Sequence, residues 1–377
     1  MHRREVLKAS LASAAAIGIS SKRAVAGPIE SAAGADGQAT GGQENQQPVL
    51  ASVYDYETAA KRKMSLPAWE YFSSGSADEI TLRRNREALD ELRLKPRVLV
   101  DMTRVDTSCI VLGNKLPHPI LLAPTSSHLL VHPDAETATA RGAGEANTIM
   151  VASTVSNRSI EDICKAASGP IWFQLYVDDD RKAVQALIER AEAAGCKALC
   201  ITADIPMPYA RNREEHIRAQ SPILPFPNLG TEARPGGGGG RTRRHFNWND
   251  LEWIQSFAKT PIILKGVLNP DDADEAVQRG VAAIVVSNHG GRVLDTEPAT
   301  IEVLPAVVDR VAGRAPVLFD SGIRRGTDVL KGLGYGASAV LIGRPYLYGL
   351  SVAGADGRME CAMSSTYSHP NWRSRWR

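Results

Sequence analysis

Side chains capable of proton transfer and ion pairing follow several short apolar runs of this 377-residue sequence. His289 follows one run, and an imidazole can accept a proton near neutral pH. Asp204 follows another and can orient such a ring, while Lys265 closes a third, where a cation has few purely structural explanations. The other residues that close such runs are Thr125, Ser126, Ser153, Gln174, Tyr176, Thr202, Asn288, Asp320, Gly343 and Arg344. These residue types predict a reaction pocket surrounded by charge and hydrogen-bonding groups.

Eight apolar runs precede these residues, and helical patterns separate them. Each run is continuous rather than alternating, which is typical of strands buried on both faces. Helices between successive strands require parallel pairing with right-handed crossovers, and eight such units close into a barrel with its chemistry at the carboxyl ends of the strands. The runs span residues 119–123, 149–153, 171–177, 198–202, 261–265, 282–287, 316–319 and 338–342. The sequence therefore predicts an α/β fold, a (β/α)₈ TIM barrel preceded by a short helical segment.

The helical segments support this interpretation. Residues 180–194 place four apolar side chains on one face, and a second helix is expected from Pro270, with acidic residues in its first turn. A doubly wound open sheet would show the same alternation of strands and helices. However, it does not explain eight runs, and no GxGxxG motif opens an early helix. The barrel is therefore the preferred fold.

The N-terminal region does not share this pattern. Arg3 and Arg4 precede a weakly apolar stretch at residues 9–20 and a small-x-small sequence at 24–26, which together predict a twin-arginine export signal over residues 1–26. The apolar stretch is too short to span a bilayer as a helix. Residues 27–48 contain almost no large apolar side chains and predict a disordered linker. We therefore expect a periplasmic or otherwise exported protein whose barrel domain covers residues 49–354.

Composition narrows the range of partners. The 44 basic and 42 acidic side chains leave a formal charge of +2, which creates no global field that would gather nucleic acid or a membrane surface. The five cysteines include no CxxC pair and no histidine at metal-ligand spacing, so we expect free, mostly buried thiols and no metal site. They are Cys109, Cys164, Cys196, Cys200 and Cys361.

Several motifs identify a family. The most specific is the sequence SNHGGRVLD at residues 287–295. Shorter motifs stand at compatible spacings: APT at 123–125, QLY at 174–176, TAD at 202–204, KG at 265–266, DSGIRRG at 320–326 and IGRP at 342–345. From about Tyr54 to about Gly354, the chain closely resembles the FMN-dependent 2-hydroxy acid oxidase and dehydrogenase family. This resemblance implies FMN as cofactor, a small L-2-hydroxy acid as substrate, and oxygen, a quinone or a cytochrome as electron acceptor.

The resemblance also implies how the substrate is held and deprotonated. His289 would be the base, with Asp204 stabilising its protonated form. Arg292 and Arg211 would hold the substrate carboxylate through charge-assisted hydrogen bonds. Arg213 lies two residues beyond Arg211 and is an alternative to it.

The remaining implied roles concern substrate and cofactor contacts. Tyr71 and Tyr176 would face the substrate, and Lys265 would stabilise the negative charge that reduction places on the flavin. The phosphate would lie against backbone N–H groups after the seventh and eighth strands. The implied phosphate-binding residues are Gly322, Arg324, Gly343 and Arg344, and the other cofactor contacts are Thr125, Ser126, Ser153, Gln174, Thr202, Ser287 and Asp320.

Some features depart from the family pattern. Ser126 stands where relatives usually have Ala or Gly, Val155 stands where glycolate oxidase has Trp, and Pro208 is another pocket position. L-lactate is the favoured substrate, but these departures leave the acid and the choice between oxidase and dehydrogenase open. Residues 214–247 predict a long mobile loop. Residues 355–377 lack apolar periodicity and resemble a truncated tail, so we expect lower stability than in full-length relatives.

Two alternatives accompany this prediction. The chain could be a non-catalytic remnant destabilised by its tail, or another FMN-binding barrel such as a flavin-dependent isomerase. Survival of all the implied chemical residues favours activity, and the paired arginines favour a carboxylate substrate. Because members of the family are typically tetramers, the resemblance also allows for a homo-oligomer. No integral membrane segment is expected.

Overall fold

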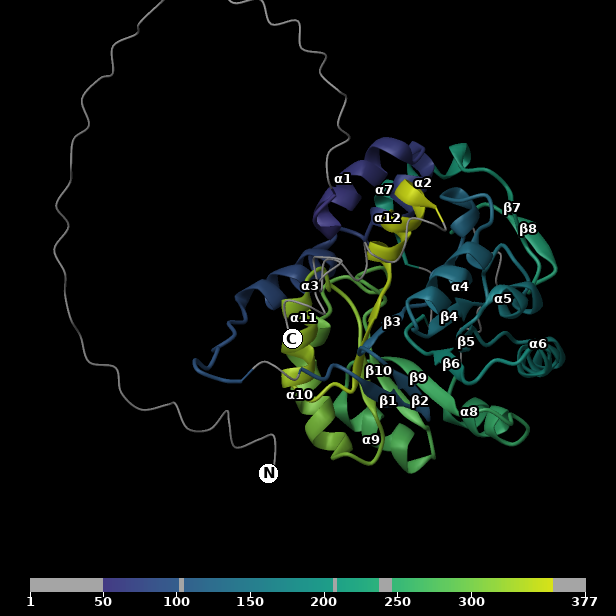
Figure 1. Cartoon of the computed structure of the whole chain (residues 1–377). Helices are drawn as coiled ribbons and strands as arrows, with labels where there is room; N and C mark the ends of the chain where they lie inside the picture. Colours follow the sequence, from purple (N-terminus) through teal and green to yellow (C-terminus); the bar gives the residue numbers. More distant parts are fainter. Residues whose placement is uncertain (1–49, 102–104, 206–208, 237–245, 355–377) are drawn as a thin grey trace, which may run out of the picture. The chain divides into compact units, whose positions relative to one another are not determined.

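A closed barrel of eight parallel strands forms the centre of the protein (Figure 1). The computed structural model describes residues 50–101, 105–205, 209–236 and 246–354, so the signal, linker and tail predictions lie outside the described residues. The strands follow one another around the barrel in chain order. They are β3 (Ile120–Leu122), β4 (Met150–Ser153), β5 (Ile171–Leu175), β6 (Leu199–Thr202), β9 (Ile262–Val267), β10 (Ala283–Val286), β11 (Val317–Phe319) and β12 (Ala339–Ile342). Each lies on one predicted apolar run, so the predicted TIM barrel is confirmed.

Alternate strand residues face two separate apolar clusters. Ile120, Leu122 and Phe173 pack in the cluster that includes the surrounding helices, whereas Leu121 and Trp172 pack in a second cluster formed mostly by strand residues. Both faces of the strands are therefore buried, which explains why the runs are continuous in sequence.

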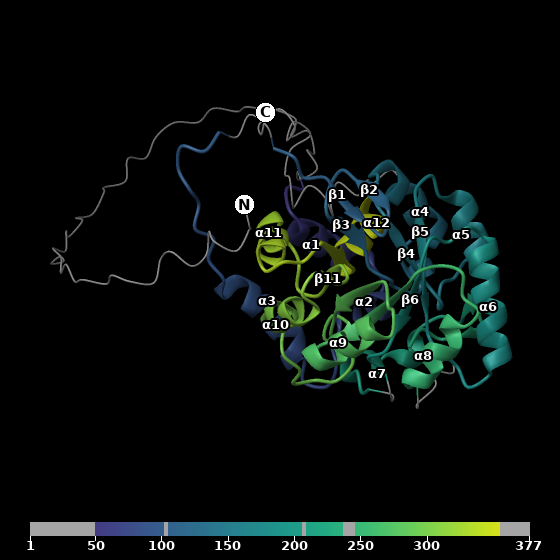
Figure 2. The same cartoon turned by 90° about the horizontal axis from the view of Figure 1, so that it is seen from below.

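Helices surround the strands, as the view from below shows (Figure 2). The helix after each strand is α4 (Glu136–Glu145), α5 (Ile160–Ala166), α6 (Arg181–Ala193), α8 (Trp248–Gln255), α9 (Pro270–Gln278), α10 (Thr300–Val311), α11 (Gly326–Gly334) and α12 (Arg344–Ala353). The predicted helix at 180–194 is α6, capped by the Asp180 side chain, with Val184, Leu187, Ile188 and Ala191 buried as expected. The helix expected from Pro270 is α9.

Within the described residues, three helices precede the barrel: α1 (Val53–Lys63), α2 (Leu66–Ser73) and α3 (Ile80–Glu91). The predicted N-terminal helical segment is therefore present. Helix α1 packs against α12, where Tyr346, Leu347 and Tyr348 are buried (Figure 1). A hairpin of β1 (Cys109–Val111) and β2 (Asn114–Leu116) follows and packs Val111 and Leu116 against the strand-residue cluster.

The segment after β6 is more ordered than its composition suggests. Prediction of one long loop over 214–247 is wrong for its first part, which contains α7 (Asn212–Glu215), a 3₁₀ turn (Arg218–Gln220) and a hairpin of β7 (Leu224–Phe226) and β8 (Thr231–Ala233). Buried Leu224 and Phe226 anchor this hairpin, and Gly230 takes the positive φ of 62° that its turn requires. Asn228 also accepts a hydrogen bond from the backbone N–H of Ile160 (2.9 Å). The proline-rich composition concealed these two short strands.

Three features expected from the sequence can be compared with the described residues: the thiols, a membrane segment and a metal site. Cys109 and Cys164 are half-buried and Cys196 and Cys200 are buried, all as free thiols, while Cys361 lies outside the described residues. Within the described ranges, no helix is long and apolar enough to cross a membrane, and no cluster of His, Cys, Asp or Glu has the arrangement of a metal site.

Candidate active site

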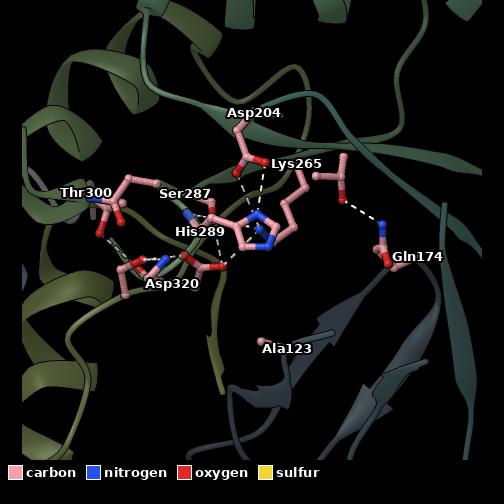
Figure 3. Close-up of polar contacts among 12 residues, drawn as sticks. Ala123, Gln174, Asp204, Lys265, Ser287, His289, Thr300 and Asp320 are labelled. Carbon is pink, nitrogen blue, oxygen red and sulfur yellow. Dashed lines mark hydrogen bonds and ion pairs between the residues drawn. The ribbon is translucent and has the colours of Figure 1, made fainter. Parts of the chain in front are cut away.

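His289 and Asp204 meet above the carboxyl ends of β10 and β6 (Figure 3). The Nδ1 atom of His289 lies 2.9 Å from Oδ1 of Asp204, so the carboxylate fixes the ring orientation. The His289 backbone adopts a positive φ of 56° and its N–H donates to Ser287 Oγ (3.1 Å). Asp204 can approach closely because β9 has Gly266 beside it, where a Cβ would lie 2.6 Å from the Asp204 Cβ. The predicted pairing of these two residues is present.

Lys265 lies within a network of acidic groups. It lies on β9, which continues two residues past the predicted end at Lys265, and its Nζ is 3.7 Å from one carboxylate oxygen of both Asp204 and Asp320. Nζ also donates to Ser287 Oγ (2.9 Å), which in turn donates to Asp320 Oδ2 (2.9 Å) (Figure 3). Burial opposes the charge of Lys265, but the two carboxylates outweigh it and raise the pKa of the ammonium above its ordinary value. The lysine therefore stays charged.

The electrostatic surroundings prepare His289 to accept a proton. Burial lowers the pKa of His289 below its ordinary value, although Asp204 acts in the opposite direction. Burial also opposes ionisation of Asp204, but His289 and Lys265 outweigh it and lower the pKa of the carboxyl. His289 is thus neutral at neutral pH, and Asp204 is ionised and able to stabilise an imidazolium.

Tyr176 lies between His289 and the part of the site that contains Tyr71 and Arg211. Its hydroxyl lies 3.4 Å from His289 Nε2. Burial raises the pKa of Tyr176, and Asp204 raises it further, so the phenol keeps its proton. Tyr71 and Arg211 also lie near enough to influence that pKa. The proton acceptor and the arginines therefore lie near one another.

Two arginines meet beside Tyr71. The Arg292 guanidinium lies over the Tyr71 ring, with 5.4 Å to the ring centroid, and its Nη1 donates to the Ser74 carbonyl (2.8 Å). Burial and the charges of Arg211 and Arg344 lower the pKa of Arg292 to about 9. Arg211 Nη1 and Arg292 Nη2 lie 3.2 Å and 3.7 Å from the same Oε2 atom of Glu214. Their guanidinium groups are therefore close enough to share one carboxylate.

Arg213 does not belong to this pair. Its guanidinium lies 2.6 Å from Glu70 Oε2 and 3.1 Å from Glu79 Oε1, and it donates to Ser73 Oγ (2.9 Å). The structure therefore favours Arg211 over Arg213 as the arginine of the pocket. Sequence reasoning did not identify Glu214, because a glutamate in a charged segment usually belongs to a solvated surface.

Polar side chains from consecutive strands line another wall of the barrel mouth. Ser153 Oγ donates to Gln174 Oε1 (3.1 Å), and Gln174 Nε2 donates to Thr202 Oγ1 (3.0 Å), so β4, β5 and β6 carry one row of groups. Figure 3 shows Gln174 of this row. Beyond Ala123 at the end of β3, Thr125 Oγ1 lies 2.7 Å from His128 Nε2 and contacts the Tyr346 hydroxyl. His128 was not among the predicted site residues. The only sequence signal for it was the polar run from Ser126 to His128.

A cavity of about 230 Å³ lies beside Gly290, the residue after His289. Gly290, Gly322, Arg324 and Arg344 are among its lining residues, with further arginines at 83 and 86. Arg344 is held by the carbonyls of Phe72, Gly290 and Ser74 (2.8, 3.0 and 3.0 Å). Gly322 has a φ of 78°, and a Cβ there would lie 2.2 Å from the Asn85 carbonyl oxygen. This arginine-rich cavity suits a phosphate.

The structure corrects one prediction about the phosphate-binding residues. The backbone N–H of Arg324, expected to face the phosphate, donates instead to Asp328 Oδ2 (2.9 Å) at the start of α11. Its guanidinium remains on the cavity lining, and Gly343 immediately precedes the N-terminus of α12. Taken together, the cavity, the buried Lys265 and the amide-hydroxyl row fit the phosphate, pyrimidine edge and ring of FMN.

Comparisons with known proteins agree with this fit. A family model described as FMN-dependent dehydrogenase matches residues 60–364. The L-lactate oxidase of Nostoc sp. is 45% identical over 323 residues, covering 81% of this chain and 88% of that protein. A peroxisomal (S)-2-hydroxyacid oxidase of Arabidopsis thaliana is 42% identical over 317 residues, covering 82% and 87%.

Solved structures give the same result. A crystal structure of mandelate oxidase with (S)-2-phenylpropionate matches with a TM-score of 0.77 and 36% identity, covering 84% of this chain and 92% of that chain. The family model spans well over half of the sequence and includes every residue of the candidate pocket. This chain therefore belongs to the FMN-dependent dehydrogenase family and is an oxidoreductase that uses FMN.

Proposed function

We propose that this chain oxidises a small L-2-hydroxy acid to the 2-oxo acid, with His289 as the base. The observation that carries the proposal is the contact of His289 Nδ1 with Asp204 Oδ1 (2.9 Å), together with the paired arginines Arg211 and Arg292. A 2-hydroxy acid presents a proton to be removed and a carboxylate to be bound, and these two groups of residues match those needs.

The chain's own residues supply binding and proton transfer. Arg211 and Arg292 bind the carboxylate, with the Tyr71 hydroxyl beside them. Oxidation releases two protons and two electrons from the substrate; His289 Nε2 takes up one proton while Asp204 stabilises the imidazolium. Bound FMN would supply the acceptor for the two electrons and the other proton.

Cofactor binding follows from the remaining side chains. Lys265 holds a positive charge where negative charge develops on reduction. The guanidinium groups of Arg324 and Arg344 bind the phosphate in the cavity. The other residues that would contact the cofactor are Thr125, Ser126, Ser153, Gln174, Thr202, Ser287, Asp320, Gly322 and Gly343.

L-lactate is the favoured substrate and oxygen the favoured electron acceptor. Support comes from the 45% identity to an L-lactate oxidase. Val155 is half-buried, whereas Pro208 lies outside the described residues. The sequence of residues 3–26 supports export by the twin-arginine route as part of this proposal.

The test is anaerobic mixing of the purified yellow holoenzyme with L-lactate, glycolate or L-mandelate, followed by admission of oxygen. We expect L-lactate to bleach the flavin absorbance fastest and oxygen to restore it rapidly. Slow restoration would indicate that a quinone or a cytochrome, and not oxygen, is the electron acceptor. Absence of bleaching by all three acids would overturn the proposed activity.

A further inference from the structure

Glu214 places a buried carboxylate between the arginines that are proposed to bind the substrate. Its side chain is 3% exposed, and its Oε2 atom lies 3.2 Å from Arg211 Nη1 and 3.7 Å from Arg292 Nη2. Among the described residues, neither carboxylate oxygen has a hydrogen-bond donor. A buried carboxylate without hydrogen bonds is unfavourable. The ion pairs with the arginines are therefore the interactions that stabilise Glu214 here.

A third arginine offers this carboxylate another partner. Arg218 Nη2 lies 3.8 Å from Oε1 of Glu214, and the buried Nε–H of Arg218 has no hydrogen-bond acceptor in the part of the chain that the structure describes. The same Nη2 atom also contacts Glu215, whose side chain is more exposed. A small rotation of Glu214 toward Arg218 would therefore satisfy an unpaired donor and an unpaired acceptor together.

The backbone around the carboxyl group keeps it close to the three arginines. A Cβ built on Gly236 would lie 1.7 Å from Glu214 Oε1 and 3.4 Å from Arg211 Nη2, so this glycine lies directly against the pair. Glu214 itself is on α7, one turn from Arg211 and one turn from Arg218. Its carboxylate can therefore change partners by side-chain rotation without leaving the helix.

A substrate carboxylate needs the same donors that face Glu214. Two carboxylates at one arginine pair repel each other, and each also competes for the same N–H groups. We propose that Glu214 is an internal counter-ion that pairs with Arg211 and Arg292 in the ligand-free enzyme and turns to Arg218 when the substrate carboxylate binds. This inference rests on the proposed use of the two arginines, and it makes Glu214 and Arg218 positioning residues that set substrate affinity.

The exchange predicts opposite effects at the two ends of the Glu214–Arg218 pair. Glu214→Gln removes the internal competitor, so carboxylates should bind more tightly. Arg218→Gln removes the partner that receives the displaced carboxylate, so they should bind less tightly. A purely structural role would weaken binding in both variants. In the double variant, loss of Arg218 should matter little because no displaced charge remains.

The measurement is titration of each FMN-loaded variant with pyruvate and with oxalate, followed by the change in flavin absorbance, together with kcat and KM for L-lactate. Glu214→Gln should lower the dissociation constants and KM roughly three- to tenfold, as expected when a competing state is removed, and change kcat by less than about twofold. Arg218→Gln should raise the same constants by a similar factor. Glu215→Gln is the matched control, because it removes a charge that also contacts Arg218 but is exposed, and it should have little effect.

Weaker or unchanged anion binding in Glu214→Gln would overturn the exchange, as would additive effects in the double variant. Should Glu214→Gln fail to fold, Arg218→Gln alone decides, since unchanged anion binding there contradicts the proposal. Failure of the proposed function looks different: the wild-type holoenzyme would then neither bleach with the three hydroxy acids nor bind the two anions.

Discussion

The two charged regions of the pocket differ in how they are supported. Asp204, Lys265, His289 and Asp320 follow or lie on neighbouring strands and contact one another directly. By contrast, Arg211, Glu214 and Arg218 lie on or beside the short helix and turn after β6, where several buried polar atoms have no hydrogen-bond partner among the described residues. The first region is fixed by the barrel, whereas the second can change partners.

This difference suggests that one region serves proton transfer and the other serves carboxylate binding. A base must stand within hydrogen-bond reach of its proton, and side chains at the ends of paired strands provide such constant geometry. Carboxylate binding tolerates, and can use, a segment whose ion pairs rearrange. Changes in the strand-borne region should therefore alter kcat most, and changes in the segment after β6 should alter KM most.

The largest effect is expected for His289→Gln. Glutamine cannot accept the substrate proton, so kcat should fall on the order of 10³-fold, within the usual range for loss of a general base. Flavin absorbance should show that FMN remains bound, and KM should change far less. Exposed His216 provides the matched control, His216→Gln, which should keep full turnover. A kcat within tenfold of wild type would refute the role of His289 as base. It would also contradict the assignment of proton transfer to the strand-borne region.

A smaller effect, with a definite pH dependence, is expected for Asp204→Asn. The carboxylate of Asp204 raises the pKa of His289 against the effect of burial, so its removal lowers that pKa further. Since His289 then stays neutral to lower pH, the acidic limb of the kcat/KM profile should move to lower pH. The plateau itself should fall roughly 10- to 100-fold, because a charge-assisted hydrogen bond to the imidazolium is lost. Movement of the limb to higher pH would contradict this assignment.

The sequence predicted the strand-borne region well for a physical reason. Continuous apolar runs identify strands buried on both faces. In a barrel the residues that follow these strands all lie at its carboxyl-terminal face. His289, Asp204 and Lys265 were thus placed together correctly from their positions alone.

The segment after β6 was predicted less well, because its contacts depend on tertiary packing. Spacing selected Arg211, but only the positions of Glu70 and Glu79 exclude Arg213 from the pocket. Burial of Glu214 has no signature in a charged stretch, and the hairpin of β7 and β8 has strands too short for a clear period. The backbone N–H of Arg324 was misassigned for a similar reason, since Asp328 reaches it from the next helical turn.

The smallest effect is expected for Ser126→Ala, which tests where the boundary between the regions lies. Ser126 follows β3, yet its hydroxyl contacts the Tyr71 hydroxyl beside Arg292. Alanine would free the Tyr71 hydroxyl for the substrate carboxylate, so KM should fall about two- to fivefold, in line with one net hydrogen bond, while kcat changes little. Ser127→Ala is the control, because Ser127 Oγ lies 3.5 Å from the same hydroxyl and holds it only weakly. A change in kcat alone would assign Ser126 to the proton-transfer region, and the division would then follow the strands rather than the contacts with Tyr71.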